Sequence, residues 1–377
     1  MSGRQVGAIS HVNPDFLVIG AGAIGLASAL ELASTGASVV VLDRGEPGRE
    51  SSWAGGGILQ ALLPWDYPAS VTSLIAYSTA LYPEWVDTVR RASDIDPEYV
   101  NTGVLVFPPF DEARARCWGG DWGVALEIIS PRVAGISSSS AERALWIRNA
   151  AQVRNPRLIS ALVESLKGPG VTIITRAEVR EIQTSRDHVT HVVTAENVWT
   201  PGSVVVAAGA WSSGLLGRLG RQLDIFPVRG QMLLYKTEPQ ALQAILLQNE
   251  HYAIPRKDGH ILVGSTQERV GFDPRITQIA RAELAQAAAS LFPPLATLSP
   301  IAHWAGLRPG SPDNIPTIAR HPSIANLYVN AGHYRYGLTM APGSARLLAN
   351  LIGGREQPID TSPYDWPASG GTKPSAV

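Results

Sequence analysis

The feature that most restricts the fold of this chain is an apolar segment that runs into a glycine-rich turn. Residues 15–20 read D-F-L-V-I-G, which is typical of a buried strand in a parallel sheet. After the turn G-A-G-A-I-G, apolar side chains recur at helical spacing until Gly36, a residue that commonly ends a helix. A second apolar segment then ends at Asp43. Residues 15–44 therefore predict one βαβ unit.

The turn itself has the spacing G-x-G-x-x-G, formed by Gly20, Gly22 and Gly25. In a dinucleotide-binding turn the first glycine allows the tight bend, the second lets a pyrophosphate approach the backbone, and the third lets helix and strand pack closely. Asp43 follows at the end of the next strand, where a carboxylate can accept hydrogen bonds from a ribose. The motif predicts nucleotide binding without deciding between NAD and FAD. The run Gly55–Gly57 favours FAD, because an open backbone suits a long ligand.

Composition excludes several other classes of protein. The chain has 377 residues, of which 31 are Lys or Arg and 32 are Asp or Glu, so a nucleic-acid partner is not expected. The single cysteine, Cys117, can form neither an intrachain disulfide nor a Cys-rich metal site, and no metal is predicted. No segment approaches the roughly 18 apolar residues of a membrane span, and the N-terminus lacks an apolar signal region. A cytoplasmic location is therefore expected.

The remaining segments predict two interleaved domains of α/β class. Strand-like segments with buried, parallel character occur early, in the middle and late in the chain, and segments typical of a mixed or antiparallel sheet lie between them. We expect a Rossmann-type FAD-binding domain with a parallel sheet from residues 15–75, 150–220 and 310–355. The substrate-binding domain, with its mixed or antiparallel sheet, would comprise residues 76–149 and 221–309. Residues 1–14 and 356–377 are expected to be flexible ends, and the last helix is expected from about Ala341 to Ile352.

Five motifs carry a resemblance to a known family. They are V-I-G-A-G-A-I-G-L, G-R-E-S-S-W-A-G-G-G-I-L, V-V-V-A-A-G-A-W-S, W-A-G-L-R-P-G-S-P-D-N-I-P and A-G-H-Y-R-Y-G-L-T-M-A-P, in chain order. The chain resembles the FAD-dependent D-amino-acid oxidase superfamily, and within it the glycine oxidases of bacterial thiamin biosynthesis. The resemblance extends from about Asp15 to Gly354.

The resemblance implies a set of FAD-binding residues. The pyrophosphate turn would comprise Gly20, Gly22, Ala23, Ile24 and Gly25, with Asp43 and Arg44 at the adenosine ribose and Ser51 and Ser52 beside the FAD. Gly56, Gly57 and Ile58 would pass the flavin ring, Val179 would contact the adenine, and Gly209 would complete this set. The stretch His333, Tyr334, Arg335, Tyr336, Gly337, Leu338 and Thr339 would run past the isoalloxazine.

The resemblance also implies the chemistry and its catalytic residues. Arg308 would bind the substrate carboxylate, Tyr252 would add a hydroxyl to that clamp, and Arg335 would lie near both flavin and substrate. The implied reaction is oxidative deamination of glycine, small amines or D-amino acids. A hydride passes from the substrate Cα to flavin N5, the imine is hydrolysed, and O2 is reduced to H2O2. The product would supply the imino acid for the thiazole of thiamin. We expect the FAD to be bound non-covalently, because Cys117 matches no position at which relatives attach it.

Two positions depart from the family pattern, and several questions stay open. The family's H-F-R-N-G is H-Y-R-Y-G here, so Tyr336 replaces a smaller side chain, and Gln267 stands where a relative has methionine. The alternatives are an FAD-dependent D-amino-acid dehydrogenase that passes electrons to a quinone or partner protein, a non-catalytic flavin-fold subunit, and an NAD-dependent dehydrogenase. The sequence leaves open the preferred substrate, the electron acceptor and whether the chain forms a homo-oligomer.

Overall fold

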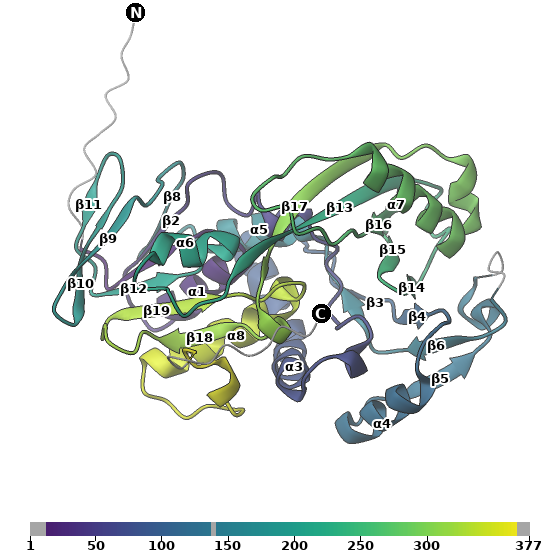
Figure 1. Ribbon diagram of the computed structural model, residues 1–377, viewed down its shortest axis with the longest axis horizontal. Coiled ribbons are helices and arrows are strands. Elements are labelled where there is room, and N and C mark those ends of the chain that lie inside the picture. Colours follow the sequence, from purple (N-terminus) through teal and green to yellow (C-terminus); the bar gives the residue numbers. More distant parts are fainter. Residues whose placement is uncertain (1–12, 137–140, 368–377) are drawn as a thin grey trace, which may run out of the picture.

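A computed structural model describes residues 13–136 and 141–367 of the chain, and it contains two large sheets. Figure 1 shows one sheet with its helices on the left, while the other extends to the right along the strands β13 and β17. Most of the predicted N-terminal arm, and the end of the predicted tail, lie outside the described residues.

The first sheet has six strands in the order β18-β19-β12-β1-β2-β8. Its strands β1 (Phe16–Ile19), β2 (Val39–Leu42), β8 (Val171–Ile174), β12 (Ser203–Val206) and β19 (Leu327–Ala331) are parallel, and β18 (Thr317–Arg320) is antiparallel to β19. The strand β1 pairs with β2 on one side and with β12 on the other. The apolar segment before the glycine-rich turn is therefore a central strand, as its continuous hydrophobicity predicts.

The longer helices of this part of the molecule pack together. They are α1 (Ala23–Ala33), α3 (Ala69–Ser93), α5 (Asn155–Ser165) and α8 (Gly337–Ile352), and α8 packs against both α1 and α3. Buried side chains of these helices join those of β1 and β2 in one hydrophobic core. The core fixes the first turn of α1 and the first turn of α8 at the carboxyl ends of the parallel strands.

The last helix begins at Gly337, four residues before the expected start at Ala341. The expectation was wrong because Pro342 does not break the helix. Proline lacks the N–H that would bond the carbonyl of Leu338. That carbonyl instead accepts a hydrogen bond of 2.6 Å from the hydroxyl of Tyr82 on α3. A tertiary contact thus lets the helix start earlier than its sequence suggests.

A small three-stranded antiparallel sheet extends this part, in the order β11-β10-β9. The strands are β9 (Glu181–Ser185), β10 (His188–Val193) and β11 (Val198–Trp199). Its side chains Val189, Val192 and Trp199 are buried with those of β1, β2, β12 and β19. The sheet thereby covers the face of the parallel strands opposite α1.

The second large sheet has eight strands in the order β17-β13-β16-β15-β14-β4-β6-β5. These strands are β4 (Val104–Val106), β5 (Leu126–Ile129), β6 (Ala144–Ile147), β13 (Phe226–Lys236), β14 (Ile245–Gln248), β15 (His251–Pro255), β16 (His260–Gly264) and β17 (Ala302–Gly310). All neighbours are antiparallel except the parallel pair β14 and β4. The helices α7 (Gln278–Leu291) and α4 (Glu112–Trp122) accompany this sheet, and a short pair, β3 (Val100–Asn101) with β7 (Ala151–Gln152), lies apart.

The sequence segments of the two sheets alternate along the chain. All strands of the six-stranded sheet come from the segments 15–75, 150–220 and 310–355, while the eight-stranded sheet is built from 76–149 and 221–309, apart from Gly310, the last residue of β17. This distribution supports our proposal of an FAD-binding and a substrate-binding domain with those boundaries. The helix α3 runs without a break across the proposed boundary at residue 75.

Part of the C-terminal stretch that we expected to be flexible is anchored. Tyr364 lies in the short 3-10 helix Ser362–Tyr364, is fully buried, and donates a hydrogen bond of 2.6 Å to the carbonyl of Ser70. The stretch is rich in Pro, Ser, Gly and Thr, and this composition did not indicate that its tyrosine would be buried. Over the residues described, none of the helices is both long enough and apolar enough to cross a membrane.

Candidate active site

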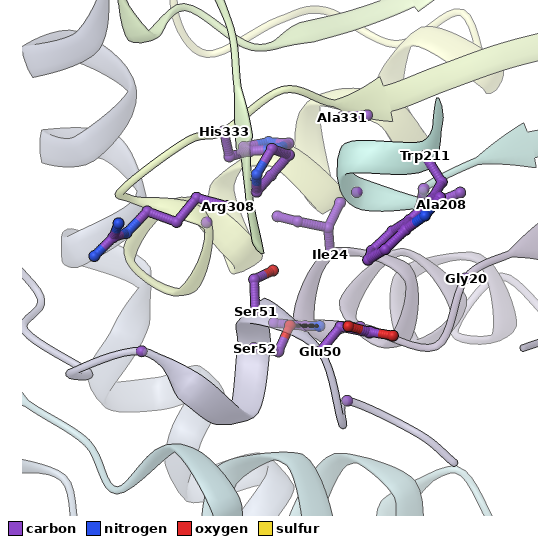
Figure 2. Close-up of a pocket in the computed structure, with 18 of the residues that line it drawn as sticks. Gly20, Ile24, Glu50, Ser51, Ser52, Ala208, Trp211, Arg308, Ala331 and His333 are labelled. Carbon is purple, nitrogen blue, oxygen red and sulfur yellow. Dashed lines mark hydrogen bonds between the residues drawn. The ribbon is translucent and has the colours of Figure 1, made fainter. Parts of the chain in front are cut away.

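A cavity of about 660 Å³ lies at the carboxyl ends of the parallel strands and reaches the second sheet. Almost every predicted site residue lines it: Gly20, Gly22, Ala23, Ile24, Asp43, Arg44, Ser51, Ser52, Gly56, Gly57, Ile58, Val179, Gly209, Tyr252, Arg308 and residues 333–339. Figure 2 shows Arg308 at one side of this cavity and Trp211 at the other, with Ile24, Ser51 and Ser52 between them. The exception is Gly25, which faces the strand.

The glycine-rich turn leaves no room for side chains. Gly20 has a φ of +108°, and a Cβ there would lie 2.5 Å from the carbonyl oxygen of Ala207. A Cβ on Gly25 would lie 1.8 Å from the carbonyl oxygen of Gly20, so this glycine serves the packing of α1 against the turn. The first N–H groups of α1 have no partner within the helix and point toward the cavity end of the sheet, an arrangement suited to an anion.

A short helix completes the wall beside this turn. The segment Gly48–Leu59 contains the single turn α2 (Ser51–Ala54). The hydroxyl oxygen of Ser52 accepts a hydrogen bond of 2.9 Å from the N–H of Ala23. Ser52 thus ties α2 to the start of α1, and Ser51 lines the cavity next to it.

Asp43 holds the turn as well as facing the cavity. One carboxylate oxygen accepts from the N–H of Ala21 at 2.7 Å, and the other accepts from the N–H of Gly45 at 2.8 Å. Each carboxylate oxygen has two lone-pair directions, so both can still accept from a ribose hydroxyl. The acidic residue therefore supports the backbone of the turn besides its predicted contact with the nucleotide.

Sequence reasoning missed an aromatic cluster at the end of the cavity near Asp43. The guanidinium of Arg44 lies 3.7 Å from the ring centre of Trp211, and the Phe272 ring lies 5.4 Å from the Trp211 ring. Arg44 also pairs with Glu50 at 2.5 Å. The tryptophan was visible in the motif A-A-G-A-W-S, but Phe272 comes from the distant loop between β16 and α7, which no local signal connects to it.

The opposite end of the cavity carries Arg308. Its Nη2 donates to the hydroxyl of Ser265 at 2.6 Å, and its Nη1 donates to the carbonyl of Thr266 at 3.0 Å. No described carboxylate forms an ion pair with it. Burial, followed by the positive charge of Arg335, lowers the pKa of Arg308, and the neighbouring Tyr252 opposes this shift. The guanidinium remains charged, because arginine does not deprotonate in proteins.

Tyr252 and Arg335 lie at the same end. Tyr252 is buried on β15, and its hydroxyl contacts the sulfur of Met232 at 3.6 Å. The Arg335 side chain is 8% exposed and pairs with Glu250 at 2.9 Å. The structure thus brings the three predicted catalytic residues together, one from each of the elements β15, β17 and the loop before α8.

The two residues that depart from the family pattern differ in burial and position. The ring of Tyr336 is buried, meets the edge of Tyr67 at a centroid distance of 5.2 Å, and its hydroxyl accepts from the N–H of Leu62 at 3.3 Å. Gln267 is exposed, accepts from the Tyr334 hydroxyl at 2.5 Å and bonds Glu250. Gln267 does not line the cavity, so it lies at the rim and not against the substrate position.

His333 is buried against the last helix. The ring is 1% exposed, and Nε2 lies 2.9 Å from the hydroxyl of Ser344 on α8. Burial lowers the pKa of His333 to about 3, which makes the ring a weak base that is neutral at physiological pH.

Three buried polar atoms on the cavity wall have no partner among the described residues. They are Oδ1 of Asn155, Oδ1 of Asn330 and Nη2 of Arg335. Buried polar groups are almost always hydrogen-bonded. These atoms, the glycine turn and the guanidinium of Arg308 at the far end fit a dinucleotide at one end of the cavity and a small anion at the other. Neither asparagine was predicted; Asn330 is a polar residue within the mostly apolar strand β19.

Comparison with known proteins agrees with this geometry. A profile of the FAD dependent oxidoreductase family DAO matches residues 15–351. A glycine oxidase of Pseudomonas aeruginosa is 43% identical over 92% of this chain and 97% of its own. A bifunctional protein ThiO/ThiG of Synechocystis is 32% identical over 90% of this chain and 51% of its own. The crystal structure of glycine oxidase from Geobacillus kaustophilus superimposes with a TM-score of 0.88, at 26% identity over 95% of this chain and 99% of that one. The chain therefore belongs to the family of FAD-dependent oxidoreductases.

Proposed function

We propose that this FAD-dependent oxidoreductase oxidatively deaminates glycine or other small amino acids with a free carboxylate. The observation that carries the proposal is the setting of Arg308. Its guanidinium is held in the cavity by two neutral oxygens, from Ser265 and Thr266, and has no acidic partner among the described residues. A desolvated charge without a counter-ion is costly, and a substrate carboxylate would supply the missing negative charge.

The neighbouring residues restrict the charge and the size of the substrate. Arg335 is already neutralised by Glu250, so the two arginines leave one uncompensated positive charge at this end. One carboxylate matches that charge. The buried rings of Tyr252 and Tyr336, together with Leu62, limit the space beside it, which favours a small side chain. Arg308 can grip the carboxylate with both nitrogens, and Tyr252 can add a neutral hydrogen bond.

The cavity accommodates FAD with its phosphates at the first turn of α1 and its flavin near the first turn of α8. When bound, FAD would supply the acceptor for the hydride, a proton with two electrons, that leaves the substrate Cα. Arg308 and Tyr252 hold the substrate so that one Cα–H faces the flavin position. Binding of the carboxylate thereby also fixes the orientation of the reacting bond. No residue has to remove a proton from Cα, consistent with a neutral, buried His333.

The remaining assignments extend the same proposal. O2 is the electron acceptor and is reduced to H2O2, the FAD is held without a covalent bond, and the imino acid formed from glycine supplies the thiazole of thiamin. The glycine oxidase and ThiO/ThiG relatives support these assignments by their names. A homo-oligomer is compatible with the proposal, in which all the site residues named above come from one chain.

The test uses the purified protein with its flavin. We expect a yellow protein that releases hydrogen peroxide with glycine, sarcosine or D-alanine in air, and none with L-alanine. Flavin reduction by glycine under anaerobic conditions without peroxide in air would identify a dehydrogenase that needs another acceptor. A yellow protein whose flavin none of these amino acids reduces would contradict the proposal.

A further inference from the structure

The residues that hold Arg308 are themselves held by a buried polar network. Ser265 and Thr266 are the first residues after β16, and neither belongs to a helix or a strand. Their oxygens fix both terminal nitrogens of the guanidinium, at 2.6 and 3.0 Å. The position of the carboxylate clamp therefore depends on what keeps this short segment in place.

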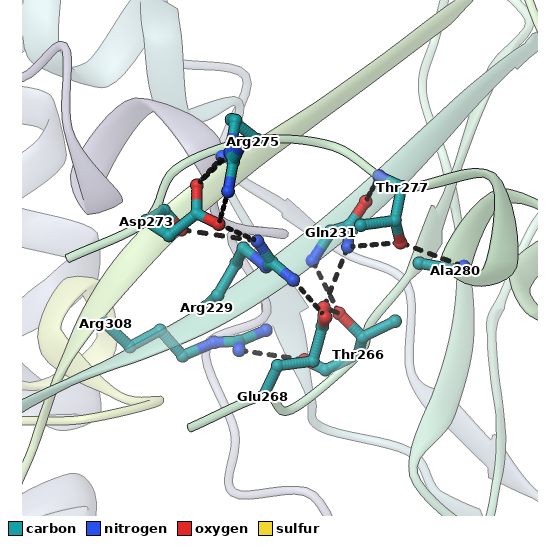
Figure 3. A network of polar contacts seen from close by, with 9 residues as sticks. All are labelled: Arg229, Gln231, Thr266, Glu268, Asp273, Arg275, Thr277, Ala280 and Arg308. Atoms are coloured by element: carbon teal, nitrogen blue, oxygen red, sulfur yellow. Dashed lines mark hydrogen bonds and ion pairs between the residues drawn. The ribbon is translucent and has the colours of Figure 1, made fainter. Parts of the chain in front are cut away.

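The segment is fastened to β13 through Glu268. One carboxylate oxygen of Glu268 accepts from the Thr266 hydroxyl at 2.6 Å and from Nε2 of Gln231 at 2.8 Å. The other oxygen pairs with Nη2 of Arg229 at 2.5 Å. The backbones of Arg229 and Glu268 also exchange two hydrogen bonds of 2.9 Å each. Figure 3 shows this network, with Arg308 below Arg229 and beside Thr266.

The network is too buried to be an ordinary surface ion pair. The side chains of Arg229 and Glu268 are 5% and 26% exposed, and Gln231 is fully buried. Although burial favours the neutral acid, hydrogen bonds from Arg229, Thr266 and Gln231 outweigh it and lower the pKa of Glu268. A buried ion pair is a poor source of net stability, because desolvation offsets most of the attraction. Its better-supported use is to specify one arrangement of the chain.

The same stretch of β13 also gives Arg308 its space. Arg229 and Gln231 point to the network, whereas Gly230 between them lies against Arg308. Because side chains alternate along a strand, Arg229 and Gln231 lie on one face of β13, and the space that Gly230 leaves for Arg308 lies on the other. Both features act on the guanidinium without touching the substrate.

We propose that Arg229 and Glu268 are positioning residues for the substrate-binding arginine, acting through Thr266. This inference rests on the proposed role of Arg308 in binding a carboxylate. It predicts that the buried ion pair contributes to the affinity for carboxylates and much less to the affinity for FAD.

The experiment compares acetate binding and FAD binding in matched variants. Glu268→Gln removes the charge but keeps the size, and Thr266→Val removes only the hydroxyl that links Glu268 to the segment. We expect Glu268→Gln to weaken acetate inhibition of glycine oxidation about 10- to 100-fold and Thr266→Val about 3- to 10-fold, while the Kd for FAD stays within twofold. The effect on glycine should appear mainly in KM, because the clamp is loosened and not removed.

A control at an exposed ion pair outside the network separates positioning from general damage. Arg91 on α3 pairs with Asp87 at 3.1 Å, and its side chain is 68% exposed. Arg91→Gln should therefore leave acetate inhibition unchanged. The double variant Arg229→Gln/Glu268→Gln should be no worse than the worse single variant, since the two charges act as one unit.

Three results would overturn the inference. They are acetate inhibition within twofold of wild type in Glu268→Gln, equal losses of acetate and FAD affinity, and additive effects of the two charges. Arg308→Ala, measured alongside, distinguishes the two proposals. If it binds acetate as wild type does, the proposed function fails; if only the Glu268 variants behave as wild type, the positioning role alone fails.

Discussion

Gly230 and Arg308 lie so close that a side chain at position 230 would displace the guanidinium. A Cβ built on Gly230 would lie 2.1 Å from Nη1 of Arg308 and 2.3 Å from its Cζ. We expect Gly230→Ala to displace the guanidinium and lower kcat/KM for glycine at least tenfold, with FAD retained. Gly120→Ala on α4, where a Cβ meets nothing within 4 Å, is the matched control for the added methyl group. Wild-type kinetics in Gly230→Ala would show that Arg308 is not held as described.

Removing the clamp itself should have a larger effect. Arg308→Ala would leave a substrate carboxylate without its partner, at a cost of roughly 2–5 kcal/mol. This corresponds to about a 30- to 5,000-fold lower kcat/KM. Tyr252→Phe removes one neutral hydrogen bond and should cost about 0.5–1.5 kcal/mol. Steady-state kinetics with glycine measure both, and equal effects of the two variants would contradict the assignment of roles.

The aromatic cluster should contribute to FAD affinity. Phe272 is 50% exposed, and its ring contacts Trp211 at the end of the cavity that we assign to the adenosine. Aromatic pairs contribute about 0.5–1.5 kcal/mol beyond the area they bury, so Phe272→Ala should raise the Kd for FAD about twofold to tenfold. Titration of the apoprotein, followed by quenching of flavin fluorescence, measures this. Ile279→Ala, at a side chain 82% exposed on α7, should leave the Kd unchanged.

His333 should make stability depend on pH in acid. The pKa of His333 is about 3 in the folded protein and about 6.5 in an unfolded chain. Protons therefore bind preferentially to the unfolded chain below pH 6.5, and this contribution to stability is present above that pH and is lost progressively as the pH falls toward 3. Between pH 7 and 4.5, urea unfolding of wild type should lose roughly 2–3 kcal/mol more than that of His333→Gln. Parallel pH profiles of the two proteins would refute this assignment.

The FAD should leave the protein without breaking a covalent bond. Cys117 lies exposed on the helix α4 and does not line the cavity. The ring of His333 is occupied by its contact with Ser344. Acid precipitation should therefore release all the yellow colour into the supernatant. Flavin that stays with the precipitated chain would disprove the prediction.

The parts of the site that the sequence revealed are those encoded locally. The turn Gly20–Gly25 and its flanking strand and helix form one continuous segment, whose steric demands are visible in the residue types themselves. Arg308 and Arg335 were found through motifs of a known family and not through physical reasoning on their surroundings. The fold class followed from the distribution of apolar segments along the chain.

The parts that were missed depend on partners far away in the sequence. Neither Glu268 nor Arg229 is unusual by itself; the buried pair exists only because β13 lies beside the segment after β16. Likewise, the start of α8 depends on a hydroxyl from α3, and Phe272 reaches Trp211 only in the folded chain. Strand pairing of this kind cannot be deduced from local propensity, because propensity carries no information on register.

The alternation of the two sheets along the chain also bears on how the protein acquires its flavin during synthesis. The wall of the cavity needs both Gly20 and Thr339, which lie more than 300 residues apart in the chain. The strand β1 likewise cannot pair with β12, and α1 cannot pack on α8, until the later segment has been synthesised. A nascent chain therefore has no complete flavin site until Thr339 has emerged, and up to that point it exists as an apoprotein. Fragments that end before residue 337 are accordingly expected to retain no FAD on gel filtration.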